Sequence, residues 1–290
     1  MNHSSFGRRA ALAGAAVAAL SRPGSAAPSF IEALFAPAAR LWPRWQAHDP
    51  TSTRAIDHRA WDAFLRRRVR RRVDGVMGVE YQAVTAEERA ALRAYLDRLA
   101  AEPVSRLARP EQYAFWVNLY NALTVRIVLD HPGVASIRDI ALSGGLFESG
   151  PWSTRVITVE AEGLTLNDIE HRILRPIWRD PRTHYALNCA SVGCPDLRPA
   201  AYAAVGLEAA LDAAARAYVN HSRGVAVGPG GLTLSSIYNW FADDFGGEAG
   251  VLAHLRHHAE PNLLAAIDRA PRILGYRYDW TLNSVASAPG

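Results

Sequence analysis

The sequence predicts an α+β fold, a single mostly helical domain with short antiparallel hairpins. Stretches with apolar residues at helical spacing are interspersed with short stretches that alternate around turn residues, and no regular strand–helix repeat connects them. Hydrophobic residues make up 49% of the chain, which is enough for a large core. No repeat, low-complexity tract or long polar linker divides the sequence, so one compact domain is expected.

The expected helices have recognisable starts and stops. Residues 85–101 open with Thr85 and Glu88 at capping-box spacing. Residues 109–133 have a proline in the first turn and Pro-Gly at the end, and they are apolar nearly all round, which predicts a buried helix. Further helices are expected at residues 57–72, 168–175, 206–221, 235–245 and 248–269, and short helices broken by prolines at 30–49.

Strands are expected where the sequence alternates. Hairpins are predicted at 153–166, about a glycine, and at 225–234. Residues 74–84 predict a short strand or extended arm, and residues 273–283 a closing strand. The stretch 184–190, HYALNCA, predicts a buried strand that runs into a turn.

The N-terminus has the layout of a bacterial export signal. A polar start is followed by Arg8 and Arg9, an apolar run and a small-residue stretch that ends near Ala27. The adjacent arginines favour the twin-arginine route over general secretion. The apolar run is too short to span a bilayer, so a periplasmic or secreted protein without stable membrane insertion is expected.

Charge gives little reason to expect a nucleic-acid partner. Residues 1–27 hold three of the 32 basic residues and none of the 28 acidic ones, so the remaining chain has a net charge of about +1. One basic run, residues 66–72, follows an amphipathic stretch and is interpreted as a solvated helix end, with contact to an anionic lipid or polymer as the alternative. The expected partner is therefore a small molecule or envelope-derived substrate.

The two cysteines lie close together in the stretch THYALNCASVGCP, residues 183–195. Cys189 follows an apolar run and precedes small residues, so the backbone there can turn sharply and present N–H groups near Ser191. A cysteine attacks only as a thiolate and needs a lowered pKa, usually from a histidine or a helix N-terminus. Cys189 is therefore a candidate nucleophile.

Two histidines are candidate bases for Cys189. In a strand, His184 and Cys189 would face opposite sides, whereas His171 lies on the preceding helix with Arg175 one turn on. Glu170 points about 100° away from His171 and is not expected to orient it.

Two asparagines stand inside the buried helix, where an amide is unfavourable unless it has a role. Asn118 or Asn121 is expected to orient the imidazole of His171. Arg175 is expected to bind an anionic substrate group, and Trp152 lies on a loop where it can line a cleft, although a core position is the alternative.

Three other interpretations remain open. Cys189 and Cys194 can form a disulfide in an oxidising compartment. Both histidines and both cysteines are suitable zinc ligand types, but their spacing is not a common zinc arrangement, so no metal or other cofactor is expected. The asparagines and His171 can also be satisfied polar groups of the core.

Several motifs, in order, are similar to those of the domain of unknown function 547 family. They include FWVNLYNALTVRIVLDHP, LTLNDIEHRILRPIW, DPRTHYALNCASVGCPDLRPAAY and YDWTLN. The resemblance covers roughly residues 57–283. It implies four segments in order: the signal at residues 1–27, an N-terminal helical extension at 28–56, the domain at 57–283 and a C-terminal tail at 284–290.

The resemblance implies that Trp116, the two asparagines, the Glu-His pair and Cys189 carry the family pattern. Bacterial members also have the second cysteine, whereas plant-type members tend to have serine there, so a disulfide is not implied for the fold. A histidine before Asn188-Cys189 is also similar to the order in circularly permuted papain-like enzymes. The sequence therefore predicts a cysteine-centred hydrolase or acyl-transfer enzyme acting on an amide or thioester. A ligand-binding or thiol-redox module is the alternative.

Overall fold

The computed structural model describes residues 37–142 and 150–285. The expected export signal and the start of the N-terminal extension lie outside the described residues. Among those described, no helix is long and apolar enough to cross a bilayer.

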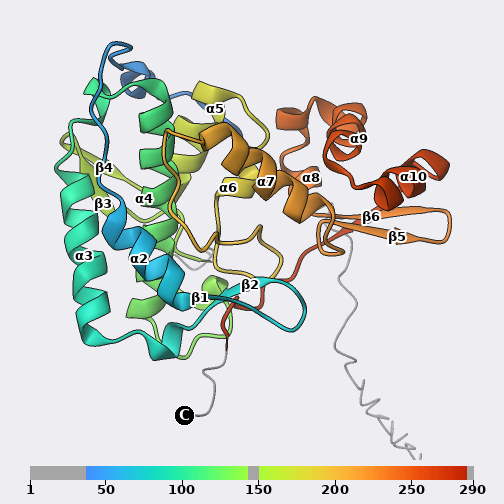
Figure 1. Ribbon diagram of the computed structural model, residues 1–290, viewed down its shortest axis with the longest axis horizontal. Helices are drawn as coiled ribbons and strands as arrows, with labels where there is room; N and C mark the ends of the chain where they lie inside the picture. Colours follow the sequence, from blue (N-terminus) through green and yellow to red (C-terminus); the bar gives the residue numbers. More distant parts are fainter. Residues whose placement is uncertain (1–36, 143–149, 286–290) are drawn as a thin grey trace, which may run out of the picture.

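The structure confirms an α+β fold in which helices dominate and the sheets are small (Figure 1). The α-helices are α2 (Arg59–Arg68), α3 (Ala86–Ala100), α4 (Arg109–Asp130), α5 (Arg175–Trp178), α6 (Thr183–Ala186), α7 (Leu207–Val219), α8 (Ile237–Trp240), α9 (Gly247–His258) and α10 (Pro261–Arg269). Short 3-10 helices are η1 (Pro43–Gln46), η2 (Tyr81–Ala83), η3 (Val104–Arg106), η4 (Ile137–Asp139) and η6 (Ala242–Phe245), and η5 (Asp168–Leu174) is a π-helix.

Seven short strands form three small sheets in the described residues. Two are hairpins, β1 (Val69–Arg71) with β2 (Met77–Val79) and β3 (Ile157–Val159) with β4 (Glu162–Leu164). The third is the hairpin β5 (Val225–Gly228) and β6 (Gly231–Ser235), to which β7 (Ile273–Arg277) adds in parallel. That parallel strand departs from the expected antiparallel hairpins, because the α9–α10 connection brings the chain back alongside β6 in the same direction.

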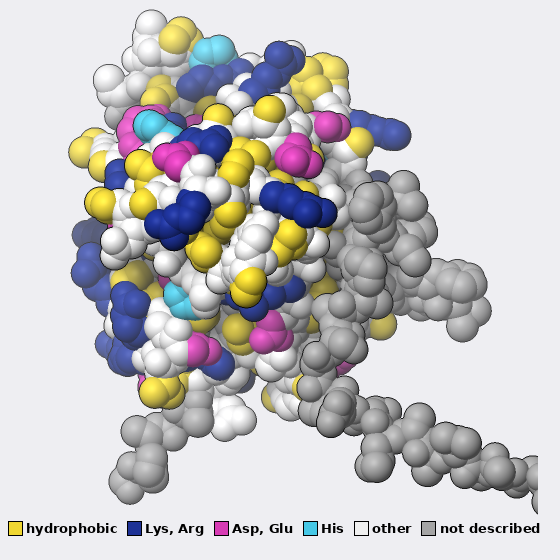
Figure 2. Space-filling model, turned by 90° about the vertical axis from the view of Figure 1, so that its right-hand side faces the viewer, with side chains coloured by type: hydrophobic (Ala, Val, Ile, Leu, Met, Phe, Trp, Pro, Cys, Tyr) yellow, Lys and Arg dark blue, Asp and Glu magenta, His cyan; other side chains and the backbone are white. Residues whose placement is uncertain are grey.

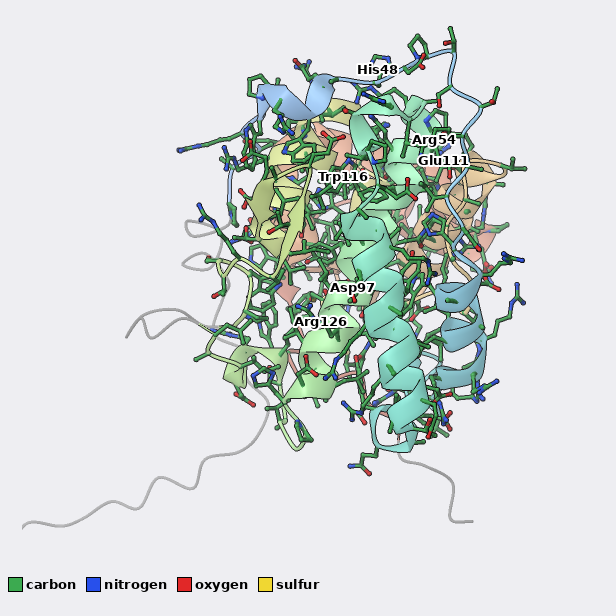
Figure 3. The ribbon with its side chains drawn as sticks, turned by 90° about the vertical axis from the view of Figure 1, so that its left-hand side faces the viewer. His48, Arg54, Asp97, Glu111, Trp116 and Arg126 are labelled. Atoms are coloured by element: carbon green, nitrogen blue, oxygen red, sulfur yellow. The ribbon has the colours of Figure 1, made fainter. Side chains whose placement is uncertain are left out.

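Helix α4 is the centre of the larger hydrophobic core. Nearly all its residues are buried, as its apolar circumference predicts, and α3 packs along it with the expected capping box at Thr85 and Glu88. Figure 3 shows α3 and α2 in front of α4, with Trp116 pointing into the packed interior. The ring of Trp45, from η1, meets Trp116 edge-on with centroids 5.0 Å apart, so the N-terminal extension closes this core.

A second, smaller core lies on the other side of the molecule. It is formed by α7, α9 and the β5–β6–β7 sheet, on the right in Figure 1. Helix α7 contacts both α6 and α9 and so runs between the two cores. Figure 2 views the side of this smaller core and shows basic and acidic side chains mixed with apolar ones.

The basic run at residues 66–72 is paired with carboxylates. Arg68 bonds to Glu88 at 2.7 Å, and further arginines of the run lie against Asp62, Glu80 and Asp74. The helix α2 ends at Arg68, and the rest of the run forms β1.

Two expected elements differ in the structure. Residues 184–190 are not a strand: α6 spans Thr183–Ala186, because the Asp180 carboxylate accepts the N–H of Arg182 and starts a helical turn. The chain becomes extended only at Leu187. The β3–β4 hairpin turns at Glu160 and Ala161, with φ of 45° and 66°, and not at Gly163.

The helix expected at 168–175 is the π-helix η5, followed by α5, which begins at Arg175. Pro176 does not end it but stands in the first turn of α5. Proline has no N–H, so it removes one helical donor at the point where the π-helix η5 passes into α5, next to the carbonyls of His171 and Arg172. These carbonyls accept from the backbone of Arg40 at 2.9 Å and of Trp42 at 3.0 Å, which fastens the N-terminal segment to η5.

Candidate functional site

The two asparagines of α4 hold backbone rather than an imidazole. Asn121 donates to the carbonyl of Ala186 at 2.9 Å and accepts the N–H of Asn188 at 2.8 Å. Asn118 makes the same two-way contact with the backbone of Tyr202, at 2.8 and 3.0 Å. Both amides are buried and used in this way, so the expectation that one of them orients His171 is wrong in this structure. Asn121 instead fixes the backbone of Ala186 and Asn188, directly before Cys189.

The turn that carries Cys189 is held from within and from the C-terminus. The Asn188 side chain accepts the N–H of Ala190 at 3.0 Å and donates to the carbonyl of Pro195 at 2.7 Å. Ala190 has φ of 61°, a left-handed conformation that costs a residue with a Cβ about 1 kcal/mol or more. Asn283 donates its backbone N–H to Ala190. A strained, buried backbone directly after a half-buried cysteine is typical of a functional turn.

Three polar groups converge on the Cys189 sulfur. The Ser191 hydroxyl lies 3.2 Å from Sγ and the Tyr278 hydroxyl 3.1 Å from it. Burial alone would raise the pKa of this thiol, but hydrogen bonds from Cys194, Ser191 and Tyr278 together with the Ser191 backbone N–H outweigh it and lower the pKa. Among the described residues, no imidazole is hydrogen-bonded to this sulfur.

Cys194 is the second thiol beside Cys189. Both cysteines are free, so the expected alternative of a disulfide is not formed in the structure. The Cys194 sulfur accepts the backbone N–H of Cys189 at 2.9 Å and faces the carbonyl of Leu187 at 3.7 Å. Its burial raises its pKa well above the ordinary value. The two thiols are therefore shifted in opposite directions.

The backbone donors around Ser191 are mostly occupied. Val192 and Gly193 donate to the carbonyls of Thr281 and Asp279, and Cys194 donates to that of Ser191. The Ser191 N–H is the one that faces the Cys189 sulfur. An oxyanion would therefore have to be stabilised by the hydroxyls of Ser191 and Tyr278, and not by a row of free N–H groups as expected from the small residues.

The two candidate bases belong to a separate, charged cluster, which consists of Glu170, His171, Arg175, His184 and Asp244. Asp244 accepts from Arg175 Nε at 2.5 Å and lies 2.7 Å from His184 Nε2. These two hydrogen bonds hold the pKa of Asp244 well below its usual range, against burial, which raises it. This aspartate, which sequence reasoning missed, is the hub of the cluster.

His171 is neutral and its acceptor nitrogen is occupied. Arg175 Nη1 lies 2.9 Å from Nδ1, and because arginine can only donate, Nδ1 is the acceptor and Nε2 carries the proton. Burial lowers the pKa of His171 to about 4. Arg175 is itself buried and also donates to the carbonyl of Pro37, so most of its donors are taken.

Glu170 lies between the two histidines without bonding to either. Its Oε1 is 3.9 Å from Nδ1 of His171 and 4.0 Å from Nδ1 of His184. The expectation that Glu170 does not hold His171 directly agrees with these distances. On its other side is Tyr120, whose pKa is raised by burial and by the charges of Glu170 and Cys189.

An aromatic chain separates the charged cluster from the thiol. Phe241 stacks on His184 with centroids 4.3 Å apart. Trp240 follows, and its ring lies 4.8 Å from that of Tyr278, whose hydroxyl reaches Cys189. Trp280 contacts Tyr278, Trp240 and Trp152, so the expected cleft residue Trp152 belongs to the same aromatic group. The Tyr278 and Phe241 contacts were missed because both residues lie far along the chain from their partners, Tyr278 directly after β7 and Phe241 between α8 and η6.

Two cavities lie near these groups. One, of about 370 Å³, has Arg175 and Asp244 in its wall, and the other, of about 300 Å³, has Tyr278 in its wall. Within 37–142 and 150–285, no three His, Cys, Asp or Glu side chains are arranged to hold a metal ion.

Comparison with known proteins adds one match. No curated protein and no solved structure matches the chain, so the permuted papain-like arrangement stays a prediction. The model of a family described as "Protein of unknown function, DUF547" matches residues 104–219. The matched stretch, residues 104–219, is similar to this family and holds both asparagines of α4, the Glu170–His171 pair and both cysteines.

Proposed function

We propose that Cys189 is the thiolate nucleophile of an acyl-transfer enzyme whose acyl donor is a thioester. One observation carries the proposal: the hydroxyls of Ser191 and Tyr278 lie 3.2 and 3.1 Å from the sulfur and lower its pKa. Hydrogen bonds to an ionised sulfur favour the reactive form. The half-buried position and the strained Ala190 that follows support the same role.

In the proposed reaction the Cys189 thiolate adds to the carbonyl carbon of the thioester. A carbon–sulfur bond forms, and the carbonyl oxygen takes the negative charge within reach of the Ser191 and Tyr278 hydroxyls. The bond to the donor sulfur then breaks, and the donor leaves as a thiolate. The acyl-Cys189 intermediate passes its acyl group to water or to another nucleophile, which returns the electron pair to Cys189.

The choice of a thioester over an amide rests on the leaving group. An amine must be protonated as it leaves, which requires a general acid at the reacting bond. The histidines lie in the charged cluster across the aromatic chain, and His171 has its Nδ1 occupied by Arg175. A thiolate leaves without a proton, so it suits a sulfur surrounded by hydroxyl donors.

The position of Cys194 favours a second candidate, thiol–disulfide exchange. Its sulfur lies against the Cys189 backbone, and its raised pKa contrasts with the lowered pKa of Cys189. In that reaction Cys189 attacks a substrate disulfide and releases one thiolate. Cys194 then loses its proton, attacks the mixed disulfide at Cys189 and releases the second thiolate.

Mass spectrometry of the reduced protein after incubation with an acetyl thioester separates the two candidates. Acyl transfer predicts an acetyl group on Cys189 that Cys189→Ser abolishes and Cys194→Ser retains. Disulfide exchange predicts no acetyl group, and an internal Cys189–Cys194 bridge after incubation with a small disulfide. Absence of acetylation on fully reduced wild-type protein would rule out the acyl-transfer proposal.

We further propose that the protein is exported and acts on envelope-derived material. The paired Arg8 and Arg9 before an apolar run support export. N-terminal sequencing of the protein recovered from a periplasmic extract tests this, with a chain beginning near Ala27 as the expected result. Recovery of the intact N-terminus from cytoplasm alone would contradict it, and Arg8→Lys/Arg9→Lys distinguishes the twin-arginine route from general secretion.

A further inference from the structure

A cavity of about 300 Å³ lies directly beside the thiol turn. Its wall includes Val192 and Gly193, which follow Cys189 in the same turn, and Tyr278, whose hydroxyl touches the Cys189 sulfur. A Cβ at Gly193 would lie 2.7 Å from the backbone N of Asp279, so only glycine allows the turn and the Tyr278 segment to approach this closely. The Tyr278 side chain therefore contacts the Cys189 sulfur and also stands in the wall of the cavity.

Two arginines stand in the wall of this cavity. Arg277 donates to the carbonyl of Ser222 at 2.5 Å and has no carboxylate partner in the part of the chain that the structure describes. Arg223 is 9% exposed, pairs with Asp196 at 2.5 Å, and has a buried Nε without a hydrogen-bond partner. A free guanidinium beside a second one is the usual protein site for carboxylate or phosphate groups.

The acidic residue of the wall is already engaged. Asp279 accepts the N–H of Thr281 at 2.9 Å and so turns toward its own backbone. Asp196 offsets the charge of Arg223, so Arg277 is the guanidinium of this wall without a carboxylate partner among the described residues. A guanidinium of this kind favours an anionic group over a neutral or cationic one.

We propose that this cavity binds an anionic group on the leaving thiol of the thioester, with Arg277 as the main contact and Arg223 behind it. The inference rests on the proposed acyl transfer at Cys189 and adds the class of acyl donor. The thioester would lie at the sulfur, and the thiol part would extend past Tyr278 into the cavity. Binding of a remote charged group then orients the reacting carbonyl.

Two acetyl thioesters of nearly equal size test the inference. One is the thioester of mercaptoacetate, which is anionic, and the other that of mercaptoacetamide, which is neutral. The second-order rate of Cys189 acetylation is measured for each by mass spectrometry at low salt. It is divided by the rate of the same thioester with a free thiol in solution, which removes the difference in intrinsic reactivity.

We expect the corrected rate to be about tenfold higher for the anionic thioester, as charge complementarity of a lined cavity commonly provides. Arg277→Gln should reduce this preference to about twofold or less by lowering the rate with the anionic thioester. Arg59→Gln, which removes the same charge from a side chain 91% exposed on α2, should retain the preference. Added salt should weaken the preference in the wild type.

The outcomes separate the inference from the function on which it rests. Acetylation of Cys189 by both thioesters at equal corrected rates would refute the anionic subsite and leave acyl transfer standing. A preference that persists in Arg277→Gln would also refute it. Failure of both thioesters to acetylate reduced Cys189 would refute acyl transfer itself.

Discussion

The thiol turn and the charged cluster differ in what surrounds their reactive groups. The thiol turn places a half-buried sulfur among hydroxyl and thiol donors that carry no charge. The charged cluster places His171 and His184 among formal charges that pair with one another, chiefly Arg175 with Asp244. In the thiol turn, uncharged donors lower the pKa of Cys189, whereas in the charged cluster Asp244 is paired with Arg175 and His184.

No hydrogen bond joins Cys189 to an imidazole among the described residues, and hydroxyl donors lower its thiol pKa. His171 is held neutral by its burial, and its Nδ1 is occupied by Arg175. The charged cluster instead fixes η5 and α6, from which the chain leads to Cys189.

The largest expected effect is on stability, in the charged cluster. Arg175→Met leaves the Asp244 carboxylate without its shortest partner, and loss of one member of a buried ion pair costs about 3–5 kcal/mol. Denaturant unfolding measures it, with the exposed Arg179→Met as the matched control. If the charged cluster and the thiol turn are independent, the pKa of the Cys189 thiol, measured from iodoacetamide labelling rates against pH, stays the same in the folded variant. A shift of that pKa would show that the two regions are coupled.

A somewhat smaller effect is expected from acid. The pKa of His171 is 6.5 in an unfolded chain and about 4 in the folded one, so between these values the unfolded state binds more protons. Stability is therefore lost as the pH falls from 6.5 to 4, on the order of 3 kcal/mol for this group. His171→Gln should flatten that part of the stability–pH curve, which His48→Gln should not. An unchanged slope in His171→Gln would show that this histidine is not held neutral.

A change of intermediate size is expected at the thiol. Tyr278→Phe removes one donor from the ionised sulfur and should lower the iodoacetamide labelling rate at neutral pH roughly tenfold, because a hydrogen bond to a charged group contributes about 1.5 kcal/mol or more. Tyr276→Phe on the same strand is the control. Labelling of Tyr278→Phe at the wild-type rate would leave the low thiol pKa without its proposed cause.

The smallest effect is expected at Cys194. Since this thiol is free, a serine can accept the Cys189 N–H and donate to Leu187 in its place, and Cys194→Ser should cost less than about 1 kcal/mol. Urea unfolding of the variant and the wild type, without reductant, measures the difference. A loss of about 3 kcal/mol would point to a disulfide in solution.

The sequence predicted elements whose causes are local. The capping box of α3 and the buried α4 lie where the pattern placed them, because caps and apolar periodicity act within a few residues. The π-helix η5 was not predicted from its own residues, and two of its carbonyls accept from Arg40 and Trp42, which lie about 130 positions earlier in the chain. The order of the cysteine and the histidines in the sequence named candidate site residues, but it did not predict their hydrogen-bond partners.

The missed partners come from far along the chain. Asp244 and Tyr278 bring the ion pair and the hydroxyl to their sites through the packing of η6 and the parallel β6–β7 pairing. Asp244 stands in no local pattern that marks it, and Tyr278 belongs to the YDWTLN motif, which does not reveal its contact with Cys189. The role of Asn121 was also hidden, because an amide that holds backbone and one that orients an imidazole look the same in sequence.

The dependence of Cys189 on Tyr278 has a consequence for biosynthesis. These residues are separated by 89 positions, and the backbone of the thiol turn is also held by Asp279, Thr281 and Asn283 at the end of the chain. Synthesis proceeds from the N-terminus, so a nascent or prematurely terminated chain carries the cysteine without these contacts. Its thiol then keeps an ordinary acidity. The lowered pKa of the Cys189 thiol therefore requires that the segment after β7, 89 positions further along the chain, has been synthesised and has docked beside the thiol turn.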